Sequence, residues 1–249
     1  MLTVDAFSIG CCAVCYGGVV ESVNGDTTRA TMEPFFSPAQ RTLQVTRQTT
    51  QLADRLLEAS VTSSLSDDQA RFVESRPLFF LATVDAFGFP SCSYKGGAPG
   101  FVRVLSPTRL TFPHFDGNGM FMSLGNIADR AKIGMLFIDF ERPQRLRVRG
   151  EAQLIDSGPL VESYPGAQYV VQLEVSNVWV NCPRYVHQMT TDAASPYVPD
   201  EAGESPIALW KRLDVMQDVL TDSDRTRALA AGLISIETYQ QMVSEGDLL

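Results

Sequence analysis

The chain has 249 residues, of which 45% are hydrophobic and 20% charged, and its formal net charge is −9. This balance is typical of a globular chain with a sizeable core, and it excludes a disordered or membrane-embedded class. Proteins that hold nucleic acid by its phosphates present a basic face. Because no dense Lys or Arg block accompanies the acidic surplus, we expect no nucleic-acid partner.

Residues 1–36 show no clear helical or strand period, and we expect an irregular leader there. The first basic residue is Arg29, and Asp5 interrupts the mildly apolar start. The segment therefore has neither the basic start of a signal peptide nor the apolar length of a membrane span. We expect no membrane partner and a cytoplasmic location.

The cysteines are Cys11, Cys12, Cys15, Cys92 and Cys182. Their odd number and spacing fit no disulfide framework. A second cysteine pair or a nearby histidine would be needed to complete a four-ligand metal site, and the sequence offers neither. Reduced thiols and no metal are expected, which is typical of the cytoplasm.

Helices are predicted at the start of the ordered part of the chain. Pro38 suits a first helical turn, and apolar residues then recur at roughly helical spacing as far as Leu57. Ser66 and Gln69 form a capping box that opens a short helix ending near Glu74. Pro77 separates this helix from the apolar run that follows it.

Six strands are predicted over residues 78–84, 91–95, 110–112, 133–138, 145–152 and 168–180, with a short helix over residues 118–128. Residues 145–152 alternate strictly and place arginines on one face. Six strands with few helices predict a mainly β (α+β) fold, a six-stranded antiparallel barrel with flanking helices, because closure removes exposed edges. We expect this domain to cover residues 37–189.

The composition changes after residue 185. Residues 190–206 are rich in Pro, Ser, Thr, Gly and acids, which predicts a linker. Residues 207–222 and 223–246 read as helical, with an apolar stripe suited to packing or to a dimer contact. Residues 190–249 are therefore predicted to form a linker and a C-terminal helical extension.

Catalytic motifs of hydrolases and nucleotidases are missing from the sequence. The two histidines, His114 and His187, have no partner at metal-binding spacing. Lys95, by contrast, ends a strand beside Gly96 and Gly97, and residues 117–127 offer a glycine turn that leads into a helix. A lysine and the N–H groups of a helix start together predict a site for one phosphorylated ligand. The alternative interpretation is a hairpin followed by an ordinary helix cap.

Three segments together resemble the pyridoxamine 5'-phosphate oxidase-like, FMN-binding split-barrel family. They read FFLATVDAFGFPSCSYKGGAPGFVRVL, GNGMFMSLGNIADRAKIGMLFIDFERPQRLRVRGEAQL and CPRYVHQM, and the resemblance covers about residues 40–190. It implies a homodimer with FMN bound at the subunit interface. By position it implies cofactor contacts from Ser93, Tyr94, Lys95, Gly96, Asn118, Gly119, Met120, Ser123, Asn126, Arg147 and Arg184.

One departure from the family pattern concerns the phosphate. Relatives often carry arginines in the loop and helix that correspond to residues 118–125, whereas this chain has no Lys or Arg between Arg109 and Arg130. The phosphate would then depend on Lys95, Arg103, backbone N–H groups or an arginine from elsewhere.

The resemblance implies an FMN-dependent oxidoreductase that acts on a small-molecule substrate, with His114 as a candidate proton donor. Two alternatives stay open at this point. One is a reductase that uses the deazaflavin F420, and the other is a flavin-binding or sensing protein without catalysis.

Overall fold

The computed structural model describes residues 34–246. The strands are β1 (Val61–Thr62), β2 (Leu78–Val84), β3 (Pro90–Gly96), β4 (Arg103–Ser106), β5 (Arg109–His114), β6 (Lys132–Asp139), β7 (Gln144–Ile155) and β8 (Tyr169–Asn181). The helices are α2 (Pro38–Thr46), α3 (Thr50–Ser60), α4 (Asp67–Ser75), α5 (Met122–Asp129), α6 (Pro159–Glu162), α7 (Asp222–Ala231) and α8 (Ile236–Glu245), with 3-10 turns η1 (Leu209–Arg212) and η2 (Asp214–Met216).

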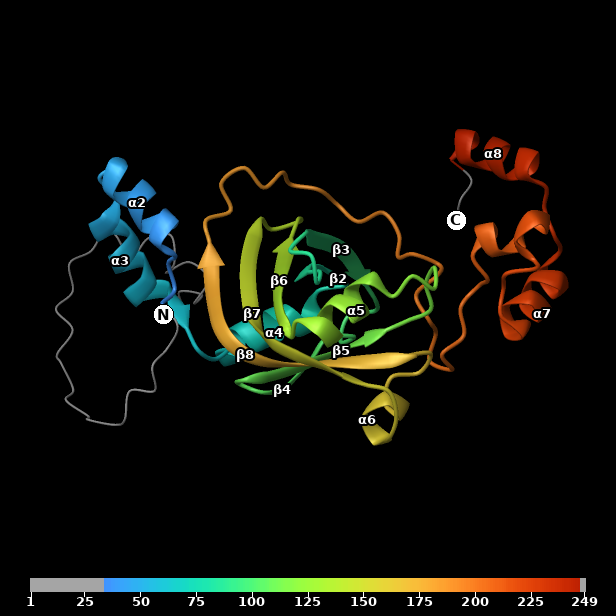
Figure 1. Ribbon diagram of the computed structural model, residues 1–249, viewed down its shortest axis with the longest axis horizontal. Coiled ribbons are helices and arrows are strands. Elements are labelled where there is room, and N and C mark those ends of the chain that lie inside the picture. The colour runs from blue at the N-terminus through green and yellow to red at the C-terminus, as the bar shows by residue number, and fades with distance from the viewer. Residues whose placement is uncertain (1–33, 247–249) are drawn as a thin grey trace, which may run out of the picture.

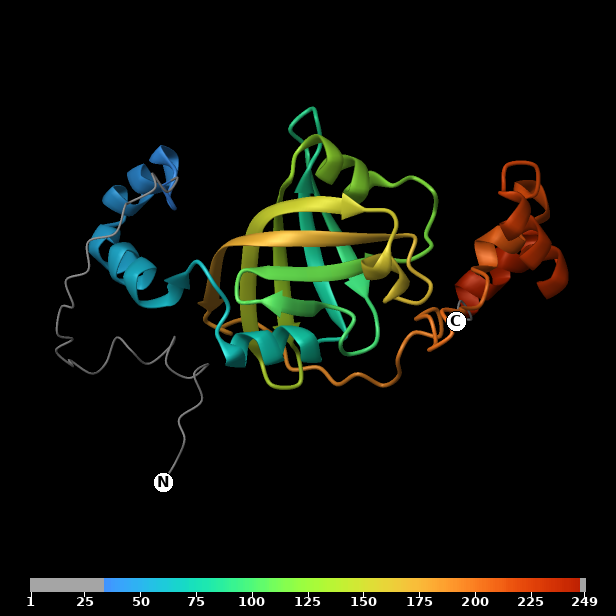
Figure 2. The ribbon, with the colours of Figure 1, turned by 90° about the horizontal axis from the view of Figure 1, so that it is seen from below.

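All the strands belong to one antiparallel sheet that curls into a split barrel (Figure 1, Figure 2). The strand order is β3-β2-β6-β7-β8-β5-β4, and β1 pairs with β8 beside this path. The mainly β barrel predicted from the sequence is confirmed, but the sheet has eight strands rather than six. The two extra strands, β1 and β4, are two and four residues long, which is too short for alternation to reveal them.

Alternation along the strands builds the core on the inner face of the sheet. In β2, Phe79 and Leu81 are buried, whereas Phe80 and Ala82 lie on the outer face. The Phe79 ring packs edge-on against Phe112 at 5.0 Å between centroids. Such aromatic contacts add to the burial of apolar area that holds the barrel together.

Gly150 lies at a β-bulge in β7, where the register with β8 shifts between Arg149 and Gly150. A Cβ at this position would lie 1.9 Å from the carbonyl oxygen of Glu174. Only glycine allows the two strand backbones to come this close.

Two pairs of helices flank the barrel on opposite sides (Figure 1, Figure 2). On one side, the predicted long helix is interrupted at Gln48, whose φ of 57° separates α2 from α3. On the other side lie α7 and α8. The prediction of a helix over residues 207–222 is wrong, because Leu213 is extended and bridges to Ile234 in place of continuing a helix.

No helix between residues 34 and 246 has the length and apolar character needed to cross a membrane. Most of the predicted leader, including Cys11, Cys12 and Cys15, lies outside the described residues. Within the described part, no group of three or more His, Cys, Asp or Glu side chains is arranged to hold a metal ion.

Candidate cofactor site

The inner face of β3 carries Ser93 and Lys95 toward α5. Ser93 pairs with Leu81 and Lys95 pairs with Phe79, so both side chains share the face of the barrel core. The hydroxyl oxygens of Ser93 and Ser123 lie 3.1 Å apart. This contact joins the middle of β3 to the first turn of α5.

Lys95 is a half-buried cation at this junction. Burial lowers the pKa of its ammonium from the ordinary value, because desolvation disfavours the charged form. Among residues 34–246, no side chain or carbonyl forms a hydrogen bond or ion pair with it. A desolvated cation without a partner is unfavourable for the protein alone, and an anionic ligand would relieve that cost.

His114 ends β5 on the same face. Its ring lies 5.7 Å from that of Phe121 and 6.4 Å from that of Tyr169, centroid to centroid. Burial and the neighbouring Lys95 charge lower its pKa to about 4, and Asp116 only partly opposes this shift. The imidazole is therefore neutral at pH 7. This does not fit the expectation that His114 supplies a proton as an acid, although a neutral ring can still donate one N–H hydrogen bond.

The loop of residues 115–121 leads from β5 into α5. Phe121 precedes the helix with φ of 50°, and no side chain caps the helix start. Gly119 adopts φ of 73°, and the Asn118 side chain accepts a hydrogen bond from the Met120 N–H at 3.1 Å. The N–H groups of the first helical turn therefore have no side-chain cap, and such groups attract anions.

We call Ser93, Lys95, His114 and Ser123, together with the uncapped start of α5, the edge cluster. The cluster links edge strand β3 to β5, the next-to-last strand of the sheet path, since the Lys95 charge acts on His114. The Ser93–Ser123 contact brings β3 and the start of α5 together, and the use of Lys95 with this helix start for one ligand stays a prediction.

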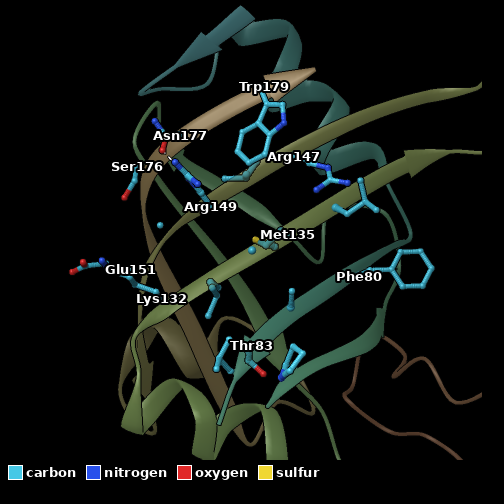
Figure 3. A pocket seen from close by; sticks show the side chains of 18 of the residues that line it. Phe80, Thr83, Lys132, Met135, Arg147, Arg149, Glu151, Ser176, Asn177 and Trp179 are labelled. Atoms are coloured by element: carbon cyan, nitrogen blue, oxygen red, sulfur yellow. Dashed lines mark hydrogen bonds between the residues drawn. The ribbon is translucent and has the colours of Figure 1, made fainter. Parts of the chain in front are cut away.

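The opposite, outer face of the sheet holds a groove of about 1000 Å³ across β2, β6, β7 and β8 (Figure 3). Ala82 lies directly opposite Gly134, and these two small residues hollow the surface. Phe80 and Trp179 supply aromatic walls. The groove is thus largely apolar, with cations along one side.

Arg147 and Arg149 both line this groove (Figure 3). Arg149 is held by Asn177 Oδ1 at 2.8 Å and lies 4.5 Å from the centre of the Phe35 ring. Arg147 is exposed, and within the described part of the chain its guanidinium has no hydrogen-bond or ion-pair partner. Strand alternation also places Tyr94 on this face, edge-on to Phe80 at 6.1 Å.

Several residues that were predicted to contact the cofactor instead contact other parts of the protein or lie away from the edge cluster. The Asn126 amide is buried and donates to Thr83 Oγ1 at 2.9 Å, so it ties α5 to β2 and does not face a ligand. A Cβ at Gly96 would meet the Tyr94 ring at 2.8 Å, so this glycine accommodates a protein side chain. Arg184 is exposed on the segment after β8, apart from the edge cluster.

Fewer cationic side chains than expected are available to a ligand at the edge cluster. Arg103 donates to the Ser163 hydroxyl and carbonyl at 2.8 and 2.7 Å and covers the Tyr164 ring. Arg130 donates to the carbonyl of Ala86 at 2.9 Å. Both guanidinium groups are therefore used within the fold, and Lys95 is the cation on the inner face of β3.

Sequence reasoning missed the groove and one buried residue, Lys211. The pairing of Ala82 with Gly134 depends on the register of β2 with β6, which no local pattern reveals. Lys211 lies within the predicted helical range 207–222 but outside its apolar stripe, yet it is buried and pairs with a residue 95 positions away.

Comparison with known proteins gives a family match and several solved structures. Residues 65–189, half of the chain, match the family model described as pyridoxamine 5'-phosphate oxidase. HupZ of Group A Streptococcus is 19% identical, with 51% of this chain and 99% of that chain covered and a TM-score of 0.41. A putative pyridoxamine 5'-phosphate oxidase of Lactobacillus delbrueckii is 26% identical, with 47% and 95% covered and a TM-score of 0.39.

An FMN-binding protein of Syntrophomonas wolfei is 12% identical, with 57% of this chain and 97% of that chain covered and a TM-score of 0.35. No curated protein matches the chain. The family model spans the barrel from the start of α4 to the segment after β8, and therefore includes both the edge cluster and the groove. On this match, the chain belongs to the pyridoxamine 5'-phosphate oxidase family.

Proposed function

We propose that this protein is an FMN-dependent oxidoreductase that acts on a small-molecule substrate, with the FMN phosphate held at the edge cluster. The observation that carries the proposal is the half-buried ammonium of Lys95, on the same strand face as Ser93, whose hydroxyl meets Ser123 in the uncapped first turn of α5. A phosphate dianion would satisfy both groups at once. When bound, FMN supplies the hydride or electron transfer.

The residues of the edge cluster suit a phosphorylated ring cofactor. Ser93 and Ser123 offer two hydroxyls 3.1 Å apart that can donate to phosphate oxygens. His114 is neutral and can hydrogen-bond to a ligand without adding charge. These groups compensate for the arginines that are missing from residues 118–125.

We further propose that the functional unit is a homodimer in which Arg147 of one protomer reaches the cofactor bound at Lys95 of the other. Within one chain the two residues lie on opposite faces of the sheet. Arg147 is nevertheless an exposed cation without a described partner, in a largely apolar groove. A second protomer seated on the groove would cover this apolar surface, and exposed surfaces of this kind favour association.

The first experiment is an absorption spectrum of the purified protein, followed by mass spectrometry of any molecule released by heat. Oxidised-flavin bands and released FMN would support the proposal, and turnover with a nicotinamide donor would then separate an enzyme from a flavin-binding protein. A colourless protein that binds F420 and ignores added FMN would replace FMN by the deazaflavin. Binding of neither would refute the flavin function.

The shared site can be tested by subunit complementation. Lys95→Met and Arg147→Ala chains carrying different tags are coexpressed, and the mixed dimers are isolated. Each parent dimer should bind FMN weakly, whereas the mixed dimer should regain one intact site per dimer. A monomer in gel filtration, or a mixed dimer that binds no better than its parents, would contradict the proposed arrangement.

A further inference from the structure

Lys211 lies in η1 of the C-terminal extension and is only 3% exposed. Its ammonium donates to Asp116 Oδ2 at 2.6 Å and to Asp224 Oδ2 at 3.0 Å. Full burial of a lysine is rare unless it is paired. The contact joins the extension, on one side of the barrel in Figure 1, to the loop that connects β5 with α5.

Asp116 stands in that loop, two residues after His114 and next to the segment that starts α5. Its negative charge reaches the edge cluster, because it acts on the His114 imidazole together with Lys95. A carboxylate close to the edge cluster would repel a phosphate bound there. The β5–α5 loop therefore places a negative charge close to the site that is proposed to bind an anion.

We propose that Lys211 is a positioning residue that neutralises Asp116, so that the edge cluster keeps the positive charge needed to hold an anion. This inference rests on the proposed function, since the anion is the FMN phosphate. The second carboxylate, Asp224, lies in the first turn of α7, where the helix dipole offsets part of its charge.

Asp116→Asn distinguishes two roles of the Lys211–Asp116 contact. If the contact only attaches the loop, this variant should bind FMN as weakly as Lys211→Met. If the contact neutralises charge, the variant should keep its FMN affinity. Lys211→Met removes the ammonium but keeps the length of the side chain, and it should weaken FMN binding by about tenfold, the equivalent of about 1.4 kcal/mol. Asp116→Asn removes the repelling charge, so its FMN affinity should equal or exceed that of the wild type. The double variant Lys211→Met with Asp116→Asn should return to within about threefold of the wild type.

Arg227→Met is the matched control. Arg227 is also a cation of the extension, and it anchors α7 to the linker of residues 190–206 by donating to the carbonyl of Ser205 at 2.5 Å. Its replacement changes the net charge by the same amount without touching Asp116. FMN binding by this variant should match that of the wild type.

The proton NMR titration of histidine provides a readout that needs no cofactor. The chain has only two histidines, and His187→Gln assigns the resonances. The charged groups that act on His114 are Lys95 and Asp116. Loss of Lys211 leaves the Asp116 charge uncompensated, so the His114 titration should move to higher pH in Lys211→Met and back in the double variant.

The outcomes separate this inference from the proposed function. Unchanged FMN affinity in Lys211→Met, or an Asp116→Asn variant that binds FMN as weakly as Lys211→Met, would overturn neutralisation. If the wild type binds no FMN, the proposed function fails and the histidine titration alone decides. A shift in Lys211→Met that the double variant reverses would then uphold neutralisation, and an unmoved His114 would overturn it.

Discussion

The hydroxyl of Ser93 in the middle of β3 lies 3.1 Å from the hydroxyl of Ser123 in the first turn of α5. The two residues are 30 positions apart, and their contact brings an edge strand and a helix start to one place. Lys95 lies two residues further along the same face of β3, and the first turn of α5 has no side-chain cap. This relationship makes the edge cluster a candidate anion site.

Replacement of Lys95 by Met should weaken FMN binding and strengthen the empty protein. Loss of one charge-assisted contact costs about 1.5–3 kcal/mol, or roughly ten- to a hundredfold in affinity. Thermal unfolding of the empty protein should move to higher temperature, because burial disfavours the charged form of this lysine.

Flavin fluorescence titration and calorimetry measure the two effects of Lys95→Met. Lys95→Arg, which keeps the charge, is the matched control and should retain more affinity than Lys95→Met. A parallel loss of stability and affinity in Lys95→Met would show that the lysine is structural.

The neutral state of His114 predicts a pH-dependent stability. An unfolded histidine titrates near pH 6.5, whereas folded His114 titrates near pH 4. Between these values the unfolded chain binds more protons, so the free energy of unfolding should fall as the pH drops from about 6.5 to about 4. The loss should be about 1–2 kcal/mol, because the imidazole is only half buried and solvent screens its charge.

Urea unfolding at a series of pH values measures this dependence on His114. His114→Gln cannot titrate in this range and should flatten that part of the profile. The control His187→Gln replaces an exposed histidine and should leave the profile as it is in the wild type. A His114→Gln profile identical to that of the wild type would exclude His114 as the source.

Asn126 is expected to contribute to stability more than to cofactor binding. Its buried amide donates to Thr83 Oγ1 at 2.9 Å, so Asn126→Ala should cost about 1–3 kcal/mol and lower the melting temperature by several degrees. The double variant with Thr83→Val should cost less than the sum of the single changes. If folded Asn126→Ala lost as much FMN affinity as Lys95→Met, Asn126 would be a ligand contact after all.

Gly150→Ala should prevent normal folding of the barrel. The new Cβ would meet the carbonyl of Glu174 at 1.9 Å, and backbone cannot move aside as a side chain can. We expect a loss of about 4 kcal/mol or more in urea unfolding, or insoluble protein. Gly125→Ala in α5 is the control, since nothing lies within 4 Å of its added Cβ. It should be stabilising by about 0.4–1 kcal/mol, and equal losses in both variants would refute the close approach at Gly150.

The sequence by itself determined the features that depend on neighbouring residues. The capping box of Ser66 and Gln69 forms as predicted, because its groups are three residues apart and need no distant partner. The strict alternation of residues 145–152 buries Leu146 and Val148 and turns Arg147 outward, as predicted, because strand side chains alternate whatever the partner strand. The apolar runs likewise revealed most strands, and hence the class of fold.

Only the tertiary structure decided which of these elements meet. The register of β2 with β6 places Ala82 opposite Gly134 and hollows the groove. The burial of Asn126 and the pairing of Lys211 with Asp116 join segments 43 and 95 residues apart. Local pattern carries no information on such contacts, because their geometry is set by the packing of the whole chain and by the desolvation that packing imposes.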